Sequence, residues 1–182
     1  MINRSSYYLF IQVLISPALD PSIELTNGGR IRILSKMRSF SNGIQVRPFQ
    51  SADFDAVINL WNECGLVMPW NDPGKDIRRK LNVQPEMFLV GCLDNRIVAT
   101  VMAGYEGHRG WINYLAVEPQ HQYTGIGRRM MEAAESKLRA AGCPKINLQV
   151  RRSNHAVIEF YERVGFKKDN VISLGKRLEP DE

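Results

Sequence analysis

Cysteine and histidine are scarce in this sequence of 182 residues, which has three of each. Cys64, Cys92 and Cys143 lie far apart and form no Cys-x-x-Cys pair, which disfavours a disulfide framework and a zinc ribbon. The histidines also lack the spacing of metal ligands. We therefore predict reduced thiols, no metal site and a cytoplasmic location.

Long hydrophobic runs are also missing. The apolar segment "YYLFIQVLI" (7–15) is far shorter than the roughly 20 residues that a membrane-spanning helix needs. Its length would suit a signal peptide, but a single Arg4 precedes it and "SPALD" is a poor cleavage site. We therefore predict neither a membrane partner nor a cleaved signal.

The charge shows no broad basic surface. The net charge is +5, and residues 1–43 hold five of the 24 basic and two of the 19 acidic side chains. The remaining residues therefore have 19 basic and 17 acidic side chains and are nearly neutral. This balance argues against a nucleic-acid partner, so any anion site must be local.

Residues 1–43 lack the helical periodicity of the later sequence and contain "TNGGR" and "SFSNG". Met37 lies just ahead of the first convincing strand pattern. We expect an N-terminal extension of uncertain order, or an upstream start codon, ahead of a domain over residues 44–182. The alternative is an N-terminal arm with a strand that packs on the domain.

The rest of the chain alternates between strand and helix patterns. Apolar runs and alternation predict strands over residues 43–49, 86–93, 96–107, 110–119, 145–151 and 171–178. Amphipathic periodicity predicts helices over residues 51–65, 75–83, 126–142 and 153–166, the first with Ser51 as its N-cap. This order predicts an α/β (α+β) fold with one mixed, mostly antiparallel sheet, parallel only across the third helix.

A glycine loop, residues 122–127 ("QYTGIG"), comes directly before the third predicted helix. The start of a helix offers unpaired N–H groups and a positive dipole end, which bind phosphate-like anions, and glycines allow close approach. Two arginines follow in the first turn, where a positive charge costs about 0.3–1 kcal/mol each unless a polyanion binds. The alternative is a structural turn in which Glu132 pairs with these arginines.

Two nucleotide-binding signatures are absent. The Walker pattern GxxxxGK[ST] does not occur, and "GIGRRM" lacks the third glycine of the dinucleotide fingerprint. The glycine loop also follows several strands and not the first one. Nucleotide hydrolysis and dinucleotide redox chemistry are therefore disfavoured.

The loop and a later segment together resemble the GNAT family of N-acetyltransferases. The strand "YLAVEP" followed by "QYTGIG" is similar to the family's Gln/Arg-x-x-Gly-x-Gly/Ala loop, and "NHAVIEFYERVGF" (154–166) to its Asn-x-x-Ala-x-x-x-Tyr-x-x-x-Gly-Phe motif. The segments "PWNDP", "MAGYEGHRGWINYLAV", "GCPKI" and "SLGKRL" are most similar to the bacterial YpeA-type subgroup. Tyr123 and Thr124 replace loop residues common in the family, while residues 1–43 match nothing in its pattern.

The resemblance implies an acyl-CoA N-acyltransferase fold and an acetyl-CoA-dependent N-acetyltransferase that uses no metal. It implies that the backbone of one strand contacts the pantetheine arm and thioester, that the loop binds the pyrophosphate, and that one asparagine contacts the cofactor. The residues implied to bind acetyl-CoA are Leu115, Ala116, Val117, Gln122, Tyr123, Thr124, Gly125, Ile126, Gly127, Arg128 and Asn154.

The resemblance also implies that Tyr161 protonates the leaving thiolate after an amine attacks the thioester. The alternative role for Tyr161 is that of a core aromatic. Glu106 is our first candidate for accepting the amine's proton through water, and Asp72 and Asp76 are the next candidates. The sequence does not identify the acceptor amine. We expect a monomer or homodimer. The alternative function is a non-catalytic acyl-CoA sensor or partner module.

Overall fold

The computed structural model describes residues 23–25, 31–33 and 43–179. Most of the predicted extension therefore lies outside the described residues. Within it, β1 (Ile23–Leu25) pairs with β2 (Ile31–Ile33) in a two-stranded antiparallel sheet. Neither strand is hydrogen-bonded to the main sheet.

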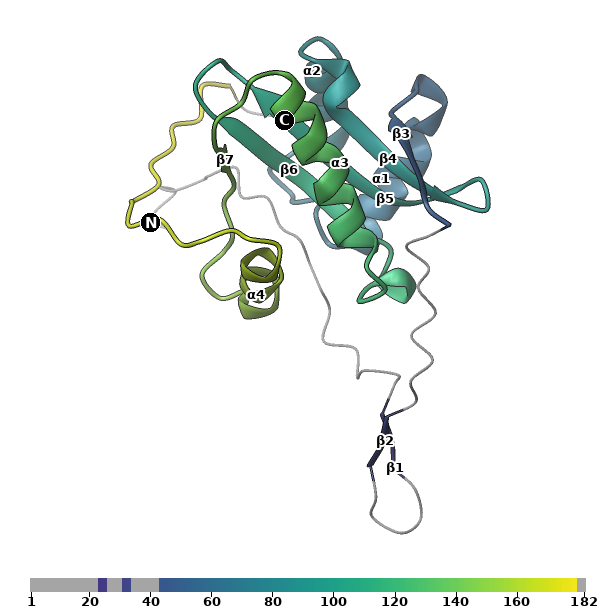
Figure 1. The fold of residues 1–182 in the computed structure, drawn as a ribbon. Helices are drawn as coiled ribbons and strands as arrows, with labels where there is room; N and C mark the ends of the chain where they lie inside the picture. Colours follow the sequence, from purple (N-terminus) through teal and green to yellow (C-terminus); the bar gives the residue numbers. More distant parts are fainter. Residues whose placement is uncertain (1–22, 26–30, 34–42, 180–182) are drawn as a thin grey trace, which may run out of the picture.

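The main sheet has five strands in the order β3-β4-β5-β6-β7 (Figure 1). The pairings from β3 to β6 are antiparallel, and β6 and β7 pair in parallel. The predicted mixed, mostly antiparallel sheet is thus confirmed. The strands are β3 (Gln45–Pro48), β4 (Phe88–Leu93), β5 (Arg96–Tyr105), β6 (Gly110–Val117) and β7 (Ile146–Asn147).

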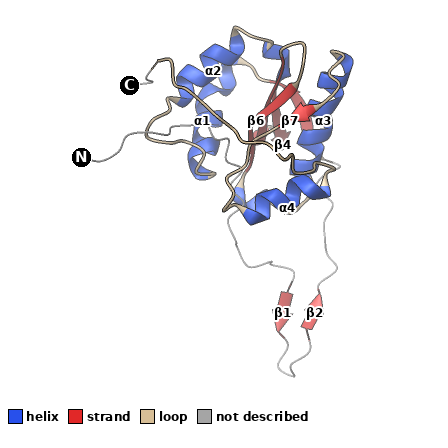
Figure 2. Cartoon of the chain, turned by 90° about the vertical axis from the view of Figure 1, so that its left-hand side faces the viewer, coloured by secondary structure: helices blue, strands red, loops and turns tan. Residues whose placement is uncertain are grey.

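Helices cover both faces of this sheet, with α1 and α2 on one side and α3 on the other (Figure 2). The first side buries Val57 and Trp61 of α1 and Ile77 of α2, and the second buries Met130 of α3 and Val157 of α4. The helices are α1 (Phe54–Glu63), α2 (Pro73–Leu81), α3 (Ile126–Ala140) and α4 (His155–Arg163), with short 3-10 turns at η2 (Ser51–Asp53), η3 (Pro85–Met87) and η4 (Pro119–His121).

The first helix starts differently from the prediction that Ser51 is its N-cap. Ser51 begins the η2 turn, and α1 follows with Asp53 at its cap position. The Asp53 carboxylate accepts the backbone N–H of Gln50 at 2.8 Å and both guanidinium arms of Arg47 at 2.6 and 2.9 Å. The ion pair with Arg47 keeps the pKa of Asp53 below its ordinary value. This charge-assisted contact joins the start of α1 to β3, and the Asp53 side chain makes no capping hydrogen bond to the helix.

The C-terminal part of the sheet is smaller than predicted. Only Ile146–Asn147 of the predicted 145–151 strand pairs with β6, and the prediction of a strand over 171–178 is wrong. Lys145 pairs with Asp169 at 2.5 Å, and Gln149 is hydrogen-bonded to Ser173. Side-chain contacts and no backbone ladder thus connect the two segments. The segment's large apolar residues, Val171, Ile172, Leu174 and Leu178, are exposed.

Candidate active site

The strand β6 contains a bulge at Tyr114. Thr100 of β5 lies opposite Ala116, but Met102 lies opposite Asn113, so two β6 residues face Val101 alone. Tyr114 has a φ of 48°, in the left-handed region that a bulky side chain rarely adopts. A bulge bends a strand, re-aims its backbone groups and occurs often beside active sites.

The edge of β6 that faces β7 is open beyond the bulge. The two strands pair only at Gly110–Ile146 and Trp111–Asn147, so the following β6 residues have no strand partner on that side within the described chain. The side chains of Leu115 and Ala116 are buried at 1% exposure. Because this edge of β6 lacks a strand partner among the described residues, the backbone of Leu115 and Ala116 can hydrogen-bond an extended ligand as an added strand would.

The glycine loop turns sharply into α3. Tyr123 has a φ of 61° and Gly125, the N-cap, a φ of 91°. The Thr124 hydroxyl donates to the carbonyl of His121 at 2.6 Å, and the Gln122 amide donates to the carbonyl of Val117 at 3.0 Å. These contacts fix the loop at the end of β6.

The first N–H groups of α3 are available to a ligand. The Gly125 carbonyl accepts the N–H of Arg129 at 3.1 Å, which is the first hydrogen bond of the helix. Among the described residues, no backbone acceptor takes the N–H of Ile126 or Gly127. This arrangement has the donors and dipole that bind a phosphate group.

A buried carboxylate holds the loop on β5. Glu118 is 9% exposed and accepts both guanidinium arms of Arg96 at 3.1 and 3.2 Å. His121 lies 3.3 Å from the same carboxylate. Because Arg96 belongs to β5 and His121 to the η4 turn directly before the glycine loop, Glu118 joins these two elements.

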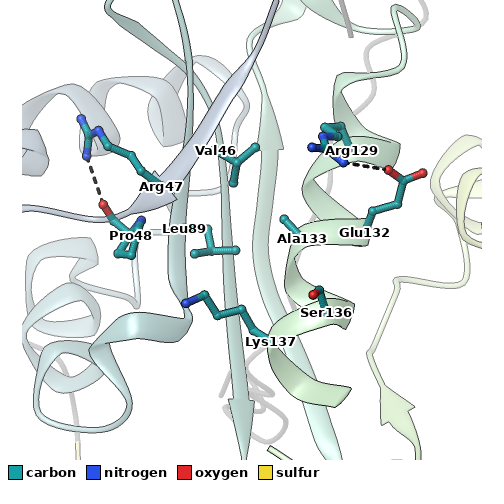
Figure 3. A pocket seen from close by; sticks show the side chains of 9 residues that line it. All are labelled: Val46, Arg47, Pro48, Leu89, Arg129, Glu132, Ala133, Ser136 and Lys137. Atoms are coloured by element: carbon teal, nitrogen blue, oxygen red, sulfur yellow. Dashed lines mark hydrogen bonds and ion pairs between the residues drawn. The ribbon is translucent and has the colours of Figure 1, made fainter. Parts of the chain in front are cut away.

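The two arginines after the loop have different neighbours. Arg128 donates to the carbonyl of Arg163 at the end of α4, at 3.2 Å. Arg129 pairs with Glu132 at 3.5 Å, which is the predicted alternative pairing. Both residues line a groove of about 390 Å³ between α3 and the strands β3 and β4, and Figure 3 shows their ion pair on α3 with Ala133 between Glu132 and Leu89. Only Arg128 lies on the side of α4.

The glycine loop and α4 lie close together. A Cβ on Gly127 would lie 3.3 Å from the ring of Phe160, tighter than an ordinary contact. Asn154 is the N-cap of α4, and its Oδ1 accepts the N–H of Val157 at 3.4 Å. The structure thus brings the loop, Arg128 and the second motif to one region.

Tyr161 lies in the core layer formed by α3, α4 and the sheet. It is 4% exposed, and its ring meets Phe160 and Phe166 edge-on at centroid distances of 5.1 and 5.4 Å. Burial raises the pKa of its phenol above the ordinary value. Tyr161 also lines a cavity of about 1120 Å³ together with Trp111 and Ile146, where β6 and β7 pair. Its phenol therefore stays protonated and can act as a donor.

The predicted carboxylates lie in different places. Glu106 is exposed, and its carboxylate accepts the N–H groups of His108 and Arg109, which lower its pKa and close the β5–β6 turn. Asp72 is the N-cap of α2 and accepts the N–H groups of Gly74 and Lys75 at 2.7 and 3.0 Å.

Asp76 is the carboxylate that reaches the bulge. Its Oδ2 accepts the hydroxyl of Tyr114 at 2.6 Å, and its Oδ1 lies 3.1 Å from Arg79. The structure thus brings Asp76 to the bulged strand and leaves Glu106 at a turn. Sequence reasoning did not identify Tyr114, since an aromatic residue inside a strand gives no sign of a bulge.

A membrane-spanning helix and a metal site were not expected, and the structure bears on both only for the described residues. There, no helix is both long and apolar enough to cross a bilayer. The same residues hold no group of three or more histidine, cysteine or acidic side chains that could bind a metal ion.

Comparison with known proteins agrees with this geometry. Residues 54–166 match the Acetyltransferase (GNAT) family. The chain is 48% identical over 139 residues to acetyltransferase YE1169 of Yersinia enterocolitica, covering 76% of this chain and 99% of that protein.

Two solved structures share the fold. An aminoglycoside acetyltransferase from an uncultured soil metagenomic sample, in complex with trehalose, has a TM-score of 0.63 at 20% identity, covering 77% of this chain and 99% of its own. The NatC complex bound to Gag peptide and CoA has a TM-score of 0.62 at 24% identity, covering 70% of this chain and 86% of its own. The assignment to the YpeA-type subgroup stays a prediction.

Proposed function

The chain belongs to the GNAT family of acetyltransferases and is an N-acetyltransferase, and from this premise we propose acetyl-CoA as its donor and a primary amine as its acceptor. The observation that carries the proposal is the continuity of three features: the bulge at Tyr114, the open edge of β6 and the helix start at Gly125. An extended thioester ending in a pyrophosphate fits such a line of backbone donors and acceptors.

The donor site is proposed to follow the chain from β6 into α3. The backbone of Leu115, Ala116 and Val117 faces the pantetheine arm and thioester. The Val117 carbonyl already accepts hydrogen bonds from the Gln122 amide and the Cys64 thiol. Val117 therefore also holds the loop in place. The proposed pyrophosphate ligands are the N–H groups of the loop and first helical turn, with Arg128 beside them; the residues are Gln122, Tyr123, Thr124, Gly125, Ile126, Gly127 and Arg128.

The reaction is a direct transfer. The thioester supplies an activated acyl group, the amine nitrogen forms a bond to its carbonyl carbon, and the carbon–sulfur bond breaks. Backbone N–H groups at the bulge stabilise the negative charge that develops on the carbonyl oxygen. The phenol of Tyr161 donates its proton to the departing thiolate, since a phenol is protonated at neutral pH. Asn154 orients the cofactor arm from the start of α4.

The amine also loses a proton, which a carboxylate takes up through water. Glu106 was the first candidate from the sequence. The Glu106 carboxylate is occupied by hydrogen bonds within the β5–β6 turn. Asp76 is the better supported candidate, because it contacts the bulged residue Tyr114. Comparing Glu106→Gln with Asp76→Asn at saturating amine separates the two.

The test is turnover against a panel of amines. Wild-type protein is mixed with acetyl-CoA and a small amine, an aminoglycoside, a peptide with a free N-terminus or a lysine peptide, and free thiol and acetylated product are measured together. We expect equal amounts of both with at least one amine. Binding of acetyl-CoA without product from any of them would instead support the acyl-CoA sensor or partner module.

A further inference from the structure

We propose that Trp61, Thr100 and Asp76 form a clamp that holds Tyr114 in its bulged conformation and so positions the neighbouring backbone for acyl transfer. The inference rests on the proposed function, because it assigns Trp61 and Thr100 as positioning residues of the same site and gives Asp76 a positioning contact besides its proposed role as proton acceptor. None of the three side chains belongs to a motif of the glycine loop or of α4. They belong to α1, β5 and α2, so the clamp joins the opposite face of the sheet to the reaction site.

The bulge needs such support because Tyr114 is strained. Its φ of 48° is a conformation that L residues with bulky side chains rarely adopt. Strained residues persist where the surrounding structure over-determines them, and they gather at functional sites. Three contacts with Tyr114, and a fourth between two of its partners, over-determine this residue.

Two of these contacts form a buried hydrogen-bond chain to the backbone. The Thr100 hydroxyl donates to the carbonyl of Tyr114 at 2.9 Å, and the indole N–H of Trp61 donates to that same hydroxyl at 2.9 Å. Trp61 and Thr100 are both 0% exposed. Because a hydroxyl has one proton, accepting from Trp61 directs that proton to the Tyr114 carbonyl. The indole thus fixes the direction in which the hydroxyl donates.

The other two contacts hold the side chain of Tyr114. Its ring stacks on Trp61 with a centroid distance of 4.0 Å and an interplanar angle of 20°. Its hydroxyl donates to Asp76 at 2.6 Å. A rotation that returned Tyr114 to the extended region would break the carbonyl contact and move the ring away from both partners.

The clamp matters for catalysis because the bulge sets the direction of the Leu115 peptide. If that peptide supplies the donor to the thioester oxygen, a displacement of about 1 Å costs on the order of 100-fold in rate. The cofactor's phosphates bind elsewhere, at the glycine loop. Loosening the clamp therefore lowers kcat and leaves acetyl-CoA affinity nearly unchanged.

The direct test replaces Thr100. Thr100→Val keeps the shape and removes the hydroxyl, and we expect kcat to fall roughly 10- to 100-fold with the Kd for acetyl-CoA within about 3-fold. Thr100→Ser keeps the hydroxyl and should restore most of kcat. Tyr114→Phe, which keeps the ring and loses the contact with Asp76, should give a smaller loss of kcat and serves if Thr100→Val does not fold.

The control is Ile44→Ala. Ile44 is 9% exposed and lies with Met130 in the core layer on the other face of the sheet, so this variant loses packing away from the clamp. It should lower the melting temperature and leave the kcat of the folded enzyme unchanged. Wild-type kcat in both Thr100→Val and Tyr114→Phe would overturn the proposal, as would an equal loss of kcat in Ile44→Ala.

Hydrogen exchange separates failure of the clamp from failure of the proposed function. In Thr100→Val, backbone N–H groups of residues 112–117 should exchange faster, while those of α3 stay as protected as in wild type. This readout needs no acceptor amine. Unchanged exchange across residues 112–117 would contradict the clamp even in a protein that acetylates amines, and faster exchange in a protein with no turnover would contradict only the proposed function.

Discussion

The thiol of Cys64, at the end of α1, donates a hydrogen bond to the carbonyl oxygen of Val117, at the end of β6, at 3.3 Å. Burial, together with the charge of Glu63, raises the pKa of this thiol to about 11. The protonated form is the donor, so ionisation would break the contact.

This contact predicts a loss of stability at alkaline pH. The folded pKa of Cys64 lies above the value of about 8.5 for a free thiol. Its contribution is therefore complete below about pH 8.5 and is lost as pH rises through about 11. Urea unfolding from pH 7 to 11 should show a steeper decline for wild type than for Cys64→Ala. Parallel curves for the two proteins would contradict this reading of the thiol.

Gly125→Ala and Gly142→Ala form a matched pair at the two ends of α3. Both glycines have positive φ, 91° and 79°, so each substitution should cost about 1–2 kcal/mol of stability. Acetyl-CoA at a hundredfold excess over its Kd should stabilise wild type by about 2.7 kcal/mol. We expect Gly142→Ala to keep this ligand effect and Gly125→Ala to lose most of it. Equal ligand effects in the two variants would move the phosphate site away from the glycine loop.

Arg128→Ala should weaken acetyl-CoA binding about 10-fold at low salt, the scale of one charge-assisted hydrogen bond. Arg129→Ala is the control, since Arg129 pairs with Glu132 on the flank that faces β3 and β4. Its effect should be several times smaller. Isothermal titration at two ionic strengths checks both variants, and the difference between them should shrink as salt screens the charges. A larger effect of Arg129→Ala would contradict the assignment.

A protein that begins at Met37 should be soluble and melt within a few degrees of the full chain. The described core layers begin at Ile44 and include both sides of the main sheet. Circular dichroism on heating compares the two proteins. An insoluble or molten shortened protein would show that "YYLFIQVLI" belongs to the core and that the predicted boundary at residue 44 is wrong.

Local features of the fold could be predicted from the sequence. The helix α3 was expected over residues 126–142 from its amphipathic period, and its buried face, Ile126, Met130, Met131, Ala134 and Leu138, follows that period. The glycine loop could also be predicted from local sequence, because glycine often occupies backbone conformations that other residues rarely adopt.

Features that depend on distant contacts could not be predicted. Tyr114 adopts a positive φ through contacts with Trp61 and Thr100, which are 53 and 14 residues away in sequence. No local residue type announces such a bulge. The prediction of a strand over residues 171–178 was wrong because a strand also needs a partner: the local pattern favours a strand, but no backbone within the described residues pairs with this segment.

Single-turnover acetyl transfer by Tyr161→Phe tests the account most directly. The ring contacts with Phe160 and Phe166 survive in this variant, so its melting temperature should stay close to wild type. Acetyl-CoA affinity should also be unchanged, while the transfer rate falls roughly 10²- to 10⁴-fold because the proton donor for the thiolate is gone. A wild-type transfer rate in folded Tyr161→Phe would contradict the proposed mechanism and leave Tyr161 as a core aromatic.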